Sequence, residues 1–181
     1  MSNKEVVNQL LSNAELIILS LVNEKPTYAY EIEKQIEARR MRHWVKIGIA
    51  SIYQVLERLN RKGYVEFDTE REGKAPERKR YFITAEGQAE LKAAVESRLT
   101  QLEGYYLDLN VALEGSDILE PNGLKKCLTE RLENARYSLE RLTQNYKAQK
   151  NQKQKAGAIA RNVMLFREAE VRFLEEFLSE L

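Results

Sequence analysis

Cysteine, histidine and tryptophan each occur once in this chain of 181 residues, and there are only three prolines and eight glycines. The single cysteine, Cys127, excludes an intramolecular disulfide, and the single histidine, His43, leaves too few ligands for a Cys/His zinc site. No apolar run approaches the roughly 18 residues that a transmembrane helix needs. The polar start of the chain gives no sign of a secretion signal. We therefore expect a cytoplasmic protein with no membrane partner, no metal site and no cofactor.

Sequence motifs of the common enzyme classes are also missing. The glycines are scattered, and none forms a phosphate-binding loop of the type G-x-G-x-x-G or G-x-x-x-x-G-K-S/T. A catalytic triad would have to use His43, which lies in a basic run with no candidate nucleophile near it. We therefore predict that the chain is not an enzyme, and we assign no catalytic residue.

Positive charge is concentrated in one half of the chain, although the formal net charge is only +1. Between Arg39 and Arg80 there are 12 lysines and arginines against 6 aspartates and glutamates. From Gln101 to the end the same count is 12 against 13. A local surplus of positive charge favours an anionic partner for the first half, although charged runs are often only solvated faces.

Three helices with recognisable boundaries are predicted in the first third of the chain. Ser12 and Glu15 fit a capping box at the start of the first helix. Thr27 is the candidate N-cap of a short second helix. Gly48 and Gly63 bound the third helix, as its N-cap and as its C′ residue. The buried face of the third helix should consist of apolar residues at helical spacing, namely Ile52, Val55, Leu56 and Leu59.

A β-hairpin is predicted directly after the third helix. Two segments with alternating polarity, residues 64–70 and 77–83, flank a turn at residues 72–76. The alternation turns Arg78 and Arg80 to the outer face of the hairpin. Three helices followed by two strands is the order of a winged helix-turn-helix domain. The inner face of the hairpin should carry Val65, Phe67, Tyr81 and Ile83.

The rest of the chain has a helical pattern. Thr84 should cap a fourth helix, and apolar residues recur every three or four positions from Leu91 to Leu113, which predicts one continuous connector helix of about 30 residues. Two further amphipathic segments, residues 124–146 and 159–181, follow this connector. Between them, residues 149–155 form a polar tract that is interpreted as a loop or as frayed helix ends.

The two C-terminal segments carry apolar stripes for which the sequence offers no third local helix. A second subunit is the usual cover for such surface, so we expect a homodimer. The predicted architecture is mainly α with a small β-hairpin wing. Residues 1–90 would form the winged helix-turn-helix domain, and residues 91–181 a helical connector and dimerisation domain.

Basic and polar residues of the third helix and the hairpin suggest contact with DNA. Proteins gain affinity for DNA by neutralising phosphates, so their cations must protrude on one surface. An alternative is that a basic hairpin only keeps an exposed sheet edge soluble. The third helix offers groups that can reach phosphates or base edges, and the hairpin offers cations: Lys46, Ser51, Tyr53 and Gln54 on the helix, and Lys74, Arg78, Lys79 and Arg80 on the hairpin.

Two motifs resemble those of the PadR family of bacterial transcriptional regulators. One is S-x-Y-x-x-L-x-R-L, from Ser51 to Leu59, and the other is R-K-x-Y-x-x-T-x-x-G, from Arg78 to Gly87. Tyr30-Glu31-Ile32 and the Trp44 region add to the resemblance, which extends over about residues 16–91. The resemblance implies a homodimeric winged-helix repressor that binds a palindromic operator in double-stranded DNA. It also implies release of the operator, in many members, by a small aromatic or hydrophobic effector.

The resemblance assigns roles to individual residues. DNA contacts would come from the helices at Tyr30, Lys46, Ser51 and Tyr53, and from the wing at Lys74, Arg78 and Lys79. Ala29 stands where the family usually has glycine, and Gln54 where proline is common. Because a glutamine can hydrogen-bond an adenine edge, we expect Gln54 to give this protein a base preference of its own.

For several residues the sequence leaves two interpretations open. Trp44 either stacks on an aromatic effector at the dimer interface or packs under the recognition helix. Cys127 is interpreted as a buried small apolar residue, with a redox sensor as the alternative. Tyr53 should be half core and half contact, and His43 should be exposed. Three aromatic residues form either an interhelix core or a ligand pocket: Phe166, Phe173 and Phe177.

The function predicted from these observations is sequence-specific DNA binding by a homodimeric transcriptional repressor. The alternative is a winged-helix protein-interaction module that does not bind DNA. The two differ in their dependence on salt, because only binding to phosphates releases condensed counterions.

Overall fold

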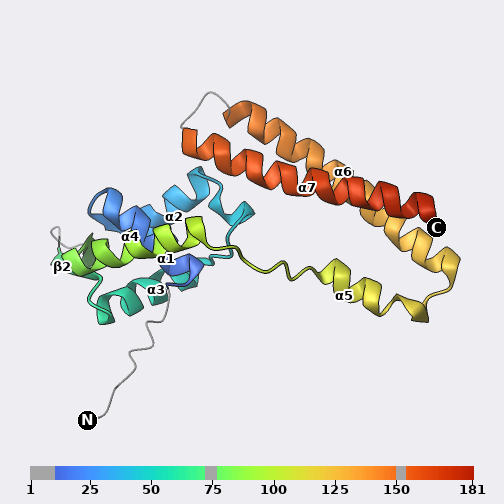
Figure 1. Cartoon of the computed structure of the whole chain (residues 1–181). Coiled ribbons are helices and arrows are strands. Elements are labelled where there is room, and N and C mark those ends of the chain that lie inside the picture. The colour runs from blue at the N-terminus through green and yellow to red at the C-terminus, as the bar shows by residue number, and fades with distance from the viewer. Residues whose placement is uncertain (1–10, 72–76, 150–153) are drawn as a thin grey trace, which may run out of the picture. The chain divides into compact units, whose positions relative to one another are not determined.

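Two compact units, residues 1–103 and 104–181, make up the chain in the computed structural model (Figure 1). The structure describes residues 11–71, 77–149 and 154–181. The predicted fold class is confirmed, because the chain is mainly helical and the first unit carries a small antiparallel wing. The elements of the first unit are α1 (Asn13–Glu24), β1 (Thr27–Tyr28), α2 (Ala29–Ala38), the 3-10 turn η1 (Met41–His43), α3 (Ile49–Arg61), β2 (Val65–Glu70), β3 (Arg78–Ile83) and α4 (Ala85–Thr100).

The start of α1 has the capping box that the sequence predicts. The backbone N–H of Glu15 donates to Ser12 Oγ at 3.2 Å, and the backbone N–H of Ser12 donates to the Glu15 carboxylate at 2.8 Å. These bonds satisfy N–H groups that a helix N-terminus would otherwise leave unpaired. The Glu15 carboxylate is also bonded by Lys62 Nζ at 2.9 Å, so the first turn of α1 is tied to the end of α3.

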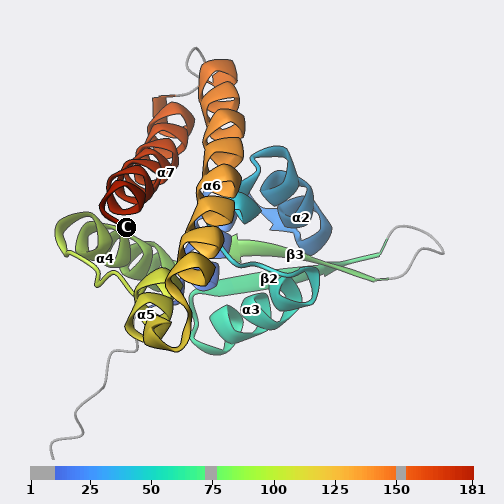
Figure 2. The same cartoon turned by 90° about the vertical axis from the view of Figure 1, so that its right-hand side faces the viewer.

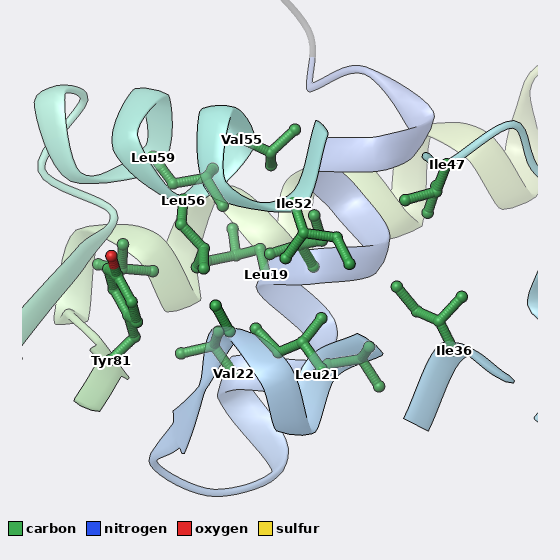
Figure 3. Close-up of a cluster of buried hydrophobic side chains, with 14 of the residues drawn as sticks. Leu19, Leu21, Val22, Ile36, Ile47, Ile52, Val55, Leu56, Leu59 and Tyr81 are labelled. Atoms are coloured by element: carbon green, nitrogen blue, oxygen red, sulfur yellow. The ribbon is translucent and has the colours of Figure 1, made fainter. Parts of the chain in front are cut away.

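Burial of apolar side chains between α1 and α3 forms the centre of the first unit. The predicted inner face of α3 is confirmed, since each of its four apolar residues is at most 1% exposed. Figure 3 shows Ile52 and Leu56 of this face directed toward Leu19 of α1. Gly48 is the N-cap of α3, and Gly63 follows its C-cap with φ of +75°, a conformation that only glycine adopts cheaply.

The wing is a three-stranded sheet in the order β1-β3-β2, with both pairs antiparallel (Figure 2). The expected pairs on its inner face are confirmed by the register, Val65 opposite Ile83 and Phe67 opposite Tyr81. Strand β1 was not expected, and the N-cap prediction at Thr27 is wrong. Tyr28 holds the N-cap position of α2, whereas Thr27 is buried in β1 and its hydroxyl donates to Glu31 at 2.8 Å.

The end of the wing is locked to α4 by a close backbone contact. Thr84 caps α4 as predicted, because its Oγ accepts the backbone N–H of Gly87 at 3.0 Å. The Thr84 hydroxyl donates to the carbonyl of Gly63 at 2.6 Å. A Cβ at position 87 would lie 2.1 Å from the carbonyl oxygen of Tyr64, so only glycine fits there. The T-x-x-G part of the second sequence motif therefore has a structural reason.

The predicted continuous connector helix is wrong. Helix α4 ends at Thr100, residues 101–107 are not helical, and α5 (Asp108–Glu114) is separate. Glycine at position 104 disfavours a helix by about 1 kcal/mol. Leu102 and Tyr106 are almost fully exposed within this chain, so no packing holds the segment in a helix.

The second unit is centred on a helical hairpin. Helices α6 (Pro121–Gln149) and α7 (Gln154–Glu180) run antiparallel and pack along their length, and the 3-10 turn η2 (Ser116–Ile118) precedes them (Figure 1). Arginines of α6 pair with glutamates of α7, Arg131 with Glu170 and Arg136 with Glu175, each at 2.7 Å. The core of this unit consists of Leu109, Leu128, Leu132, Ala135, Val171 and Leu174.

Several expectations for the second unit need correction. Cys127 is exposed rather than buried, because the core stripe of α6 passes through Leu128 and not through its neighbour. Phe177 packs against the core, whereas Phe166 and Phe173 remain 53% and 41% exposed. The polar tract at residues 149–155 falls largely outside the described residues. No helix in the described part of the chain is both long enough and apolar enough to cross a membrane.

The Glu15 contacts predict a pH-dependent contribution to stability. Burial raises the pKa of the Glu15 carboxyl, but hydrogen bonds from Lys62 and from the backbone of Ser12 lower it by more, so the pKa lies below its usual value. A carboxyl whose pKa is lowered by folding stabilises the protein at neutral pH, and this contribution is lost as pH falls through the folded-state pKa. Glu15→Gln should therefore reduce the free energy of unfolding by about 1–3 kcal/mol at pH 7.

Urea unfolding of the two proteins at pH 7 and at pH 3 measures this difference. The gap in the free energy of unfolding between wild type and Glu15→Gln should be narrower at pH 3 than at pH 7, because the contribution of a carboxyl with a lowered pKa is lost as pH falls. Glu96→Gln is the matched control, because Glu96 and Lys92 form an exposed pair at 3.9 Å that should contribute little. An equal gap at the two pH values would show that the charge of Glu15 is not what stabilises the fold.

Candidate nucleic-acid interface

The outer face of α3 is polar and aromatic, and it is open to solvent. Tyr53 is 58% exposed and Ile49 is 63% exposed, and Gln54 is exposed beside them. The first turn of α3 has no acidic residue, so the positive end of the helix dipole is not offset there. Tyr53 does not pack into the core to the extent that the sequence suggests. It lies largely on the surface, where it can reach a partner.

Two of the helix-side candidates flank the start of α3. Lys46 is exposed, between the buried side chains of Val45 and Ile47, which fix the segment that carries it. Ser51 is half buried, and its hydroxyl donates to the carbonyl of Gly48 at 2.5 Å. Ser51 therefore supports the first turn of the helix, while Lys46 projects a free charge next to it.

Some of the arginines counted in the sequence form ion pairs with glutamates inside the first unit. Arg39 forms two hydrogen bonds with Glu24, at 2.5 and 2.6 Å. Arg42 donates to Glu33 and Glu37 of α2 and to the carbonyl of Ile47, all within 3.0 Å. Proximity of Glu33 raises the pKa of the Arg42 guanidinium. These arginines hold the segment before α3 in place and are not available to a partner.

The inner face of the wing carries an aromatic pair with a lysine beside it. The ring of Phe67 packs against Tyr81, with 5.6 Å between centroids, and Lys79 Nζ lies 4.2 Å above the Phe67 ring. Burial raises the pKa of the Tyr81 hydroxyl, and Tyr53 of α3 adds to this effect because it lies close by. A row of side chains thus runs from Tyr53 on α3 to Lys79 on the wing.

The outer face of the wing has a different charge environment. Arg80 lies 3.5 Å from the Glu70 carboxylate, and Tyr28 Oη donates to the same carboxylate at 2.5 Å. This hydrogen bond raises the pKa of the Tyr28 hydroxyl. Arg78 lies over the ring of Tyr30, with 6.0 Å from its Cζ to the ring centroid. The structure thus separates the two arginines that the sequence groups together.

Two further lysines bear on the candidate interface, one that the sequence predicts and one that it does not. Lys74, predicted at the tip of the wing, lies outside the described residues. Lys34 was not among the sequence candidates, yet its Nζ lies 5.4 Å from the centroid of the Tyr30 ring. The signal in the sequence was the spacing of four residues between Tyr30 and Lys34, which places both side chains on one face of a helix.

Trp44, the candidate effector residue, does not lie under the recognition helix. It is 38% exposed and lines a hollow of about 460 Å³ within the first unit. The wall of this hollow is partly apolar and partly charged, and it includes Leu16, Ile17, Trp44, Val45, Arg98 and Leu102. His43 is exposed, as expected. Within the described residues no cluster of acidic, histidine and cysteine side chains is suited to hold a metal ion.

The arrangement of three helices, a small sheet and an exposed third helix defines the class of winged helix-turn-helix proteins. Residues 18–93 match the model of the transcriptional regulator PadR-like family, so the winged-helix unit of this chain is similar to members of that family. The family comprises transcriptional regulators rather than enzymes. No curated protein is significantly similar to the chain in sequence.

Solved structures with the same fold extend over nearly the whole chain. The PadR protein of Bacillus subtilis in complex with operator DNA superposes with a TM-score of 0.75 at 19% identity, covering 92% of this chain and 97% of that one. The same protein in complex with p-coumaric acid gives 0.72 at 18% identity, covering 92% and 96%. A PadR-like transcriptional regulator of Bacillus cereus gives 0.64 at 21% identity, with the same coverage. At these identities the likeness establishes the shared fold.

Proposed function

We propose that this protein is a sequence-specific, DNA-binding transcriptional repressor that acts in the cytoplasm as a homodimer on a palindromic operator. The observation that carries the proposal is the surface formed by α3 and the inner face of the wing. There Lys46 and Lys79 carry positive charge with no carboxylate partner among the described residues, on either side of Tyr53 and Gln54. Neutralisation of phosphates by such cations supplies affinity, and polar side chains between them supply specificity.

The first turns of α3 are the part of the molecule suited to a major groove. An α-helix fits this groove, and its N-terminal residues reach the base edges in helix-turn-helix proteins. Gln54 and Tyr53 occupy these turns and are exposed, whereas Ser51 is half buried and its hydroxyl already donates to the carbonyl of Gly48. In this arrangement Lys46 meets the phosphates beside the groove, and Tyr30 of α2 with Arg78 and Lys79 of the wing meets the phosphates further along.

The second unit supplies the surface for the homodimer. Three large aromatic side chains of the α6–α7 hairpin are more than 40% exposed within one chain: Tyr137, Phe166 and Phe173. Exposed apolar surface of this kind is usually covered by a partner, and a twofold axis then presents two wings to the DNA. For neighbouring half-sites, one helical turn of DNA places the two recognition helices about 34 Å apart.

The hollow beside Trp44 is the site proposed to bind a small aromatic or hydrophobic effector. Its volume of about 460 Å³ is within the range of small-molecule sites. Trp44 offers an aromatic face, and Arg98 offers a positive charge that suits an acidic group of the effector. The B. subtilis relative was solved with an aromatic acid, p-coumaric acid. An effector in this hollow would contact both α1 and the segment before α3.

Binding of the full chain to duplex DNA at several salt concentrations tests the proposed function. The logarithm of the affinity should fall linearly with the logarithm of the salt concentration, by about 0.9 for each phosphate that the protein neutralises. Affinity for duplex DNA that is undetectable even at low salt would contradict the proposal. It would favour a winged helix that docks on another protein.

The glutamine on α3 should determine part of the base preference. We expect Gln54→Ala to change the sequence selected from randomised duplexes while affinity for random DNA changes little, because Gln54 is uncharged and exposed. A bidentate contact to an adenine edge discriminates by about 1–3 kcal/mol. Gln88→Ala, which alters an exposed glutamine on α4, is the control. Selection of the same sequence by Gln54→Ala and wild type would show that this residue does not contact a base.

The second unit should hold the dimer together. Sedimentation of the full chain should give twice the mass of one chain, which is 21.1 kDa. Truncation after Glu103, at the boundary between the two units, should give a monomer with weak affinity for the operator. A truncated protein that still sediments as a dimer would contradict the role assigned to α6 and α7.

A further inference from the structure

The two arginines on the outer face of the wing, Arg78 and Arg80, have different neighbours. On the outer face, the register places Asp68 opposite Arg80 and Glu70 opposite Arg78. Both oxygens of the Glu70 carboxylate are occupied, one by Tyr28 Oη and the other by Arg80. Arg78 makes no ion pair within the described residues, and its contact is the Tyr30 ring. The same face thus holds one arginine beside a carboxylate and one beside an aromatic ring.

Tyr30 orients a second cation as well. Its ring stacks on that of Tyr28, with 5.5 Å between centroids and an angle of 18° between planes. Lys34 lies 5.4 Å from the centroid of the Tyr30 ring and Arg78 lies 6.0 Å from it. Lys34 also makes no ion pair with any described residue. Two cations from different elements, α2 and β3, therefore converge on one exposed tyrosine.

Three glutamates of α2, the helix that carries Lys34, are hydrogen-bonded by other residues. Glu31, one turn before Lys34, accepts the hydroxyl of Thr27 at 2.8 Å. Glu33 and Glu37 are both bonded by Arg42. Among the described residues, neither Lys34 nor Arg78 forms an ion pair with a carboxylate, so both cations remain available to a phosphate.

An aromatic ring and a carboxylate have different consequences for a nearby cation. The ring attracts the cation through its quadrupole and limits its motion, but it carries no net charge. The cation therefore keeps its full charge for a phosphate. A carboxylate cancels the charge, and a cation that is already cancelled releases no counterions from DNA.

We propose that Lys34 and Arg78, held over the ring of Tyr30, form a phosphate-binding site at the edge between α2 and β3, and that Arg80 is a positioning residue neutralised by Glu70. This inference rests on the proposed function, because the phosphate belongs to the DNA backbone. It adds Lys34 to the interface and removes Arg80 from the phosphate contacts that the sequence suggests.

Salt dependence of binding to random duplex DNA, measured on the full chain, distinguishes these roles. Lys34→Ala and Arg78→Ala should each make the slope of log affinity against log salt less steep by about 0.9, since each removes one neutralised phosphate. Arg80→Ala should leave the slope unchanged, although it can lower affinity at every salt concentration by loosening the wing. Lys92→Ala removes an exposed lysine of α4 and is the control for loss of charge alone.

Glu70→Gln tests the same inference in the opposite direction. Removing the negative charge frees Arg80, so the slope should become steeper by up to about 0.9. Circular dichroism and the thermal midpoint establish that each variant is folded. An Arg80→Ala slope as shallow as that of Arg78→Ala, or a Lys34→Ala slope equal to wild type, would overturn the inference while the proposed function stands. A wild type that binds no duplex at low salt would overturn both.

Discussion

Packing of α3 on α1 is the contact on which the rest of the first unit depends. Leu19, Leu21 and Val22 of α1 meet the inner face of α3 and are fully buried (Figure 3). α1 also contacts α2, β3 and α4, so the other helices and the central strand of the sheet are placed relative to it. Because the inner face of α3 is held in this way, its outer face is fixed toward solvent. The same burial that stabilises the domain therefore presents Tyr53 and Gln54.

Ion pairing decides which cations of the first unit remain available to a partner. Arg39, Arg42 and Lys62 are bonded to glutamates of α1 and α2, and they hold the start and the end of α3 in place. Lys46 and Lys79 have no carboxylate partner among the described residues. The basic surplus between Arg39 and Arg80 thus has two parts, one that stabilises the domain and one that remains free on its surface.

Local signals were sufficient for much of the fold. The capping box at Ser12, the glycines that bound α3 and the alternation in the wing each depend on a few neighbouring residues, and all are confirmed. The prediction of a continuous connector helix was wrong for a physical reason. Apolar spacing alone cannot tell a packed helix from a segment such as residues 101–107, whose apolar side chains are largely exposed. Strand β1 was missed because two residues are too short to show a period.

The sequence by itself determined the class of domain, the boundaries of α3 and the kinds of residue on its surface, because propensity, capping and periodicity act over short distances. Only the tertiary structure decided which charges are free. Glu70 reaches Arg80 across a strand pair, Lys62 reaches Glu15 over a separation of 47 positions, and Arg78 meets Tyr30 from another element. Pairing of this kind depends on distances in space, and the order of residues does not contain it.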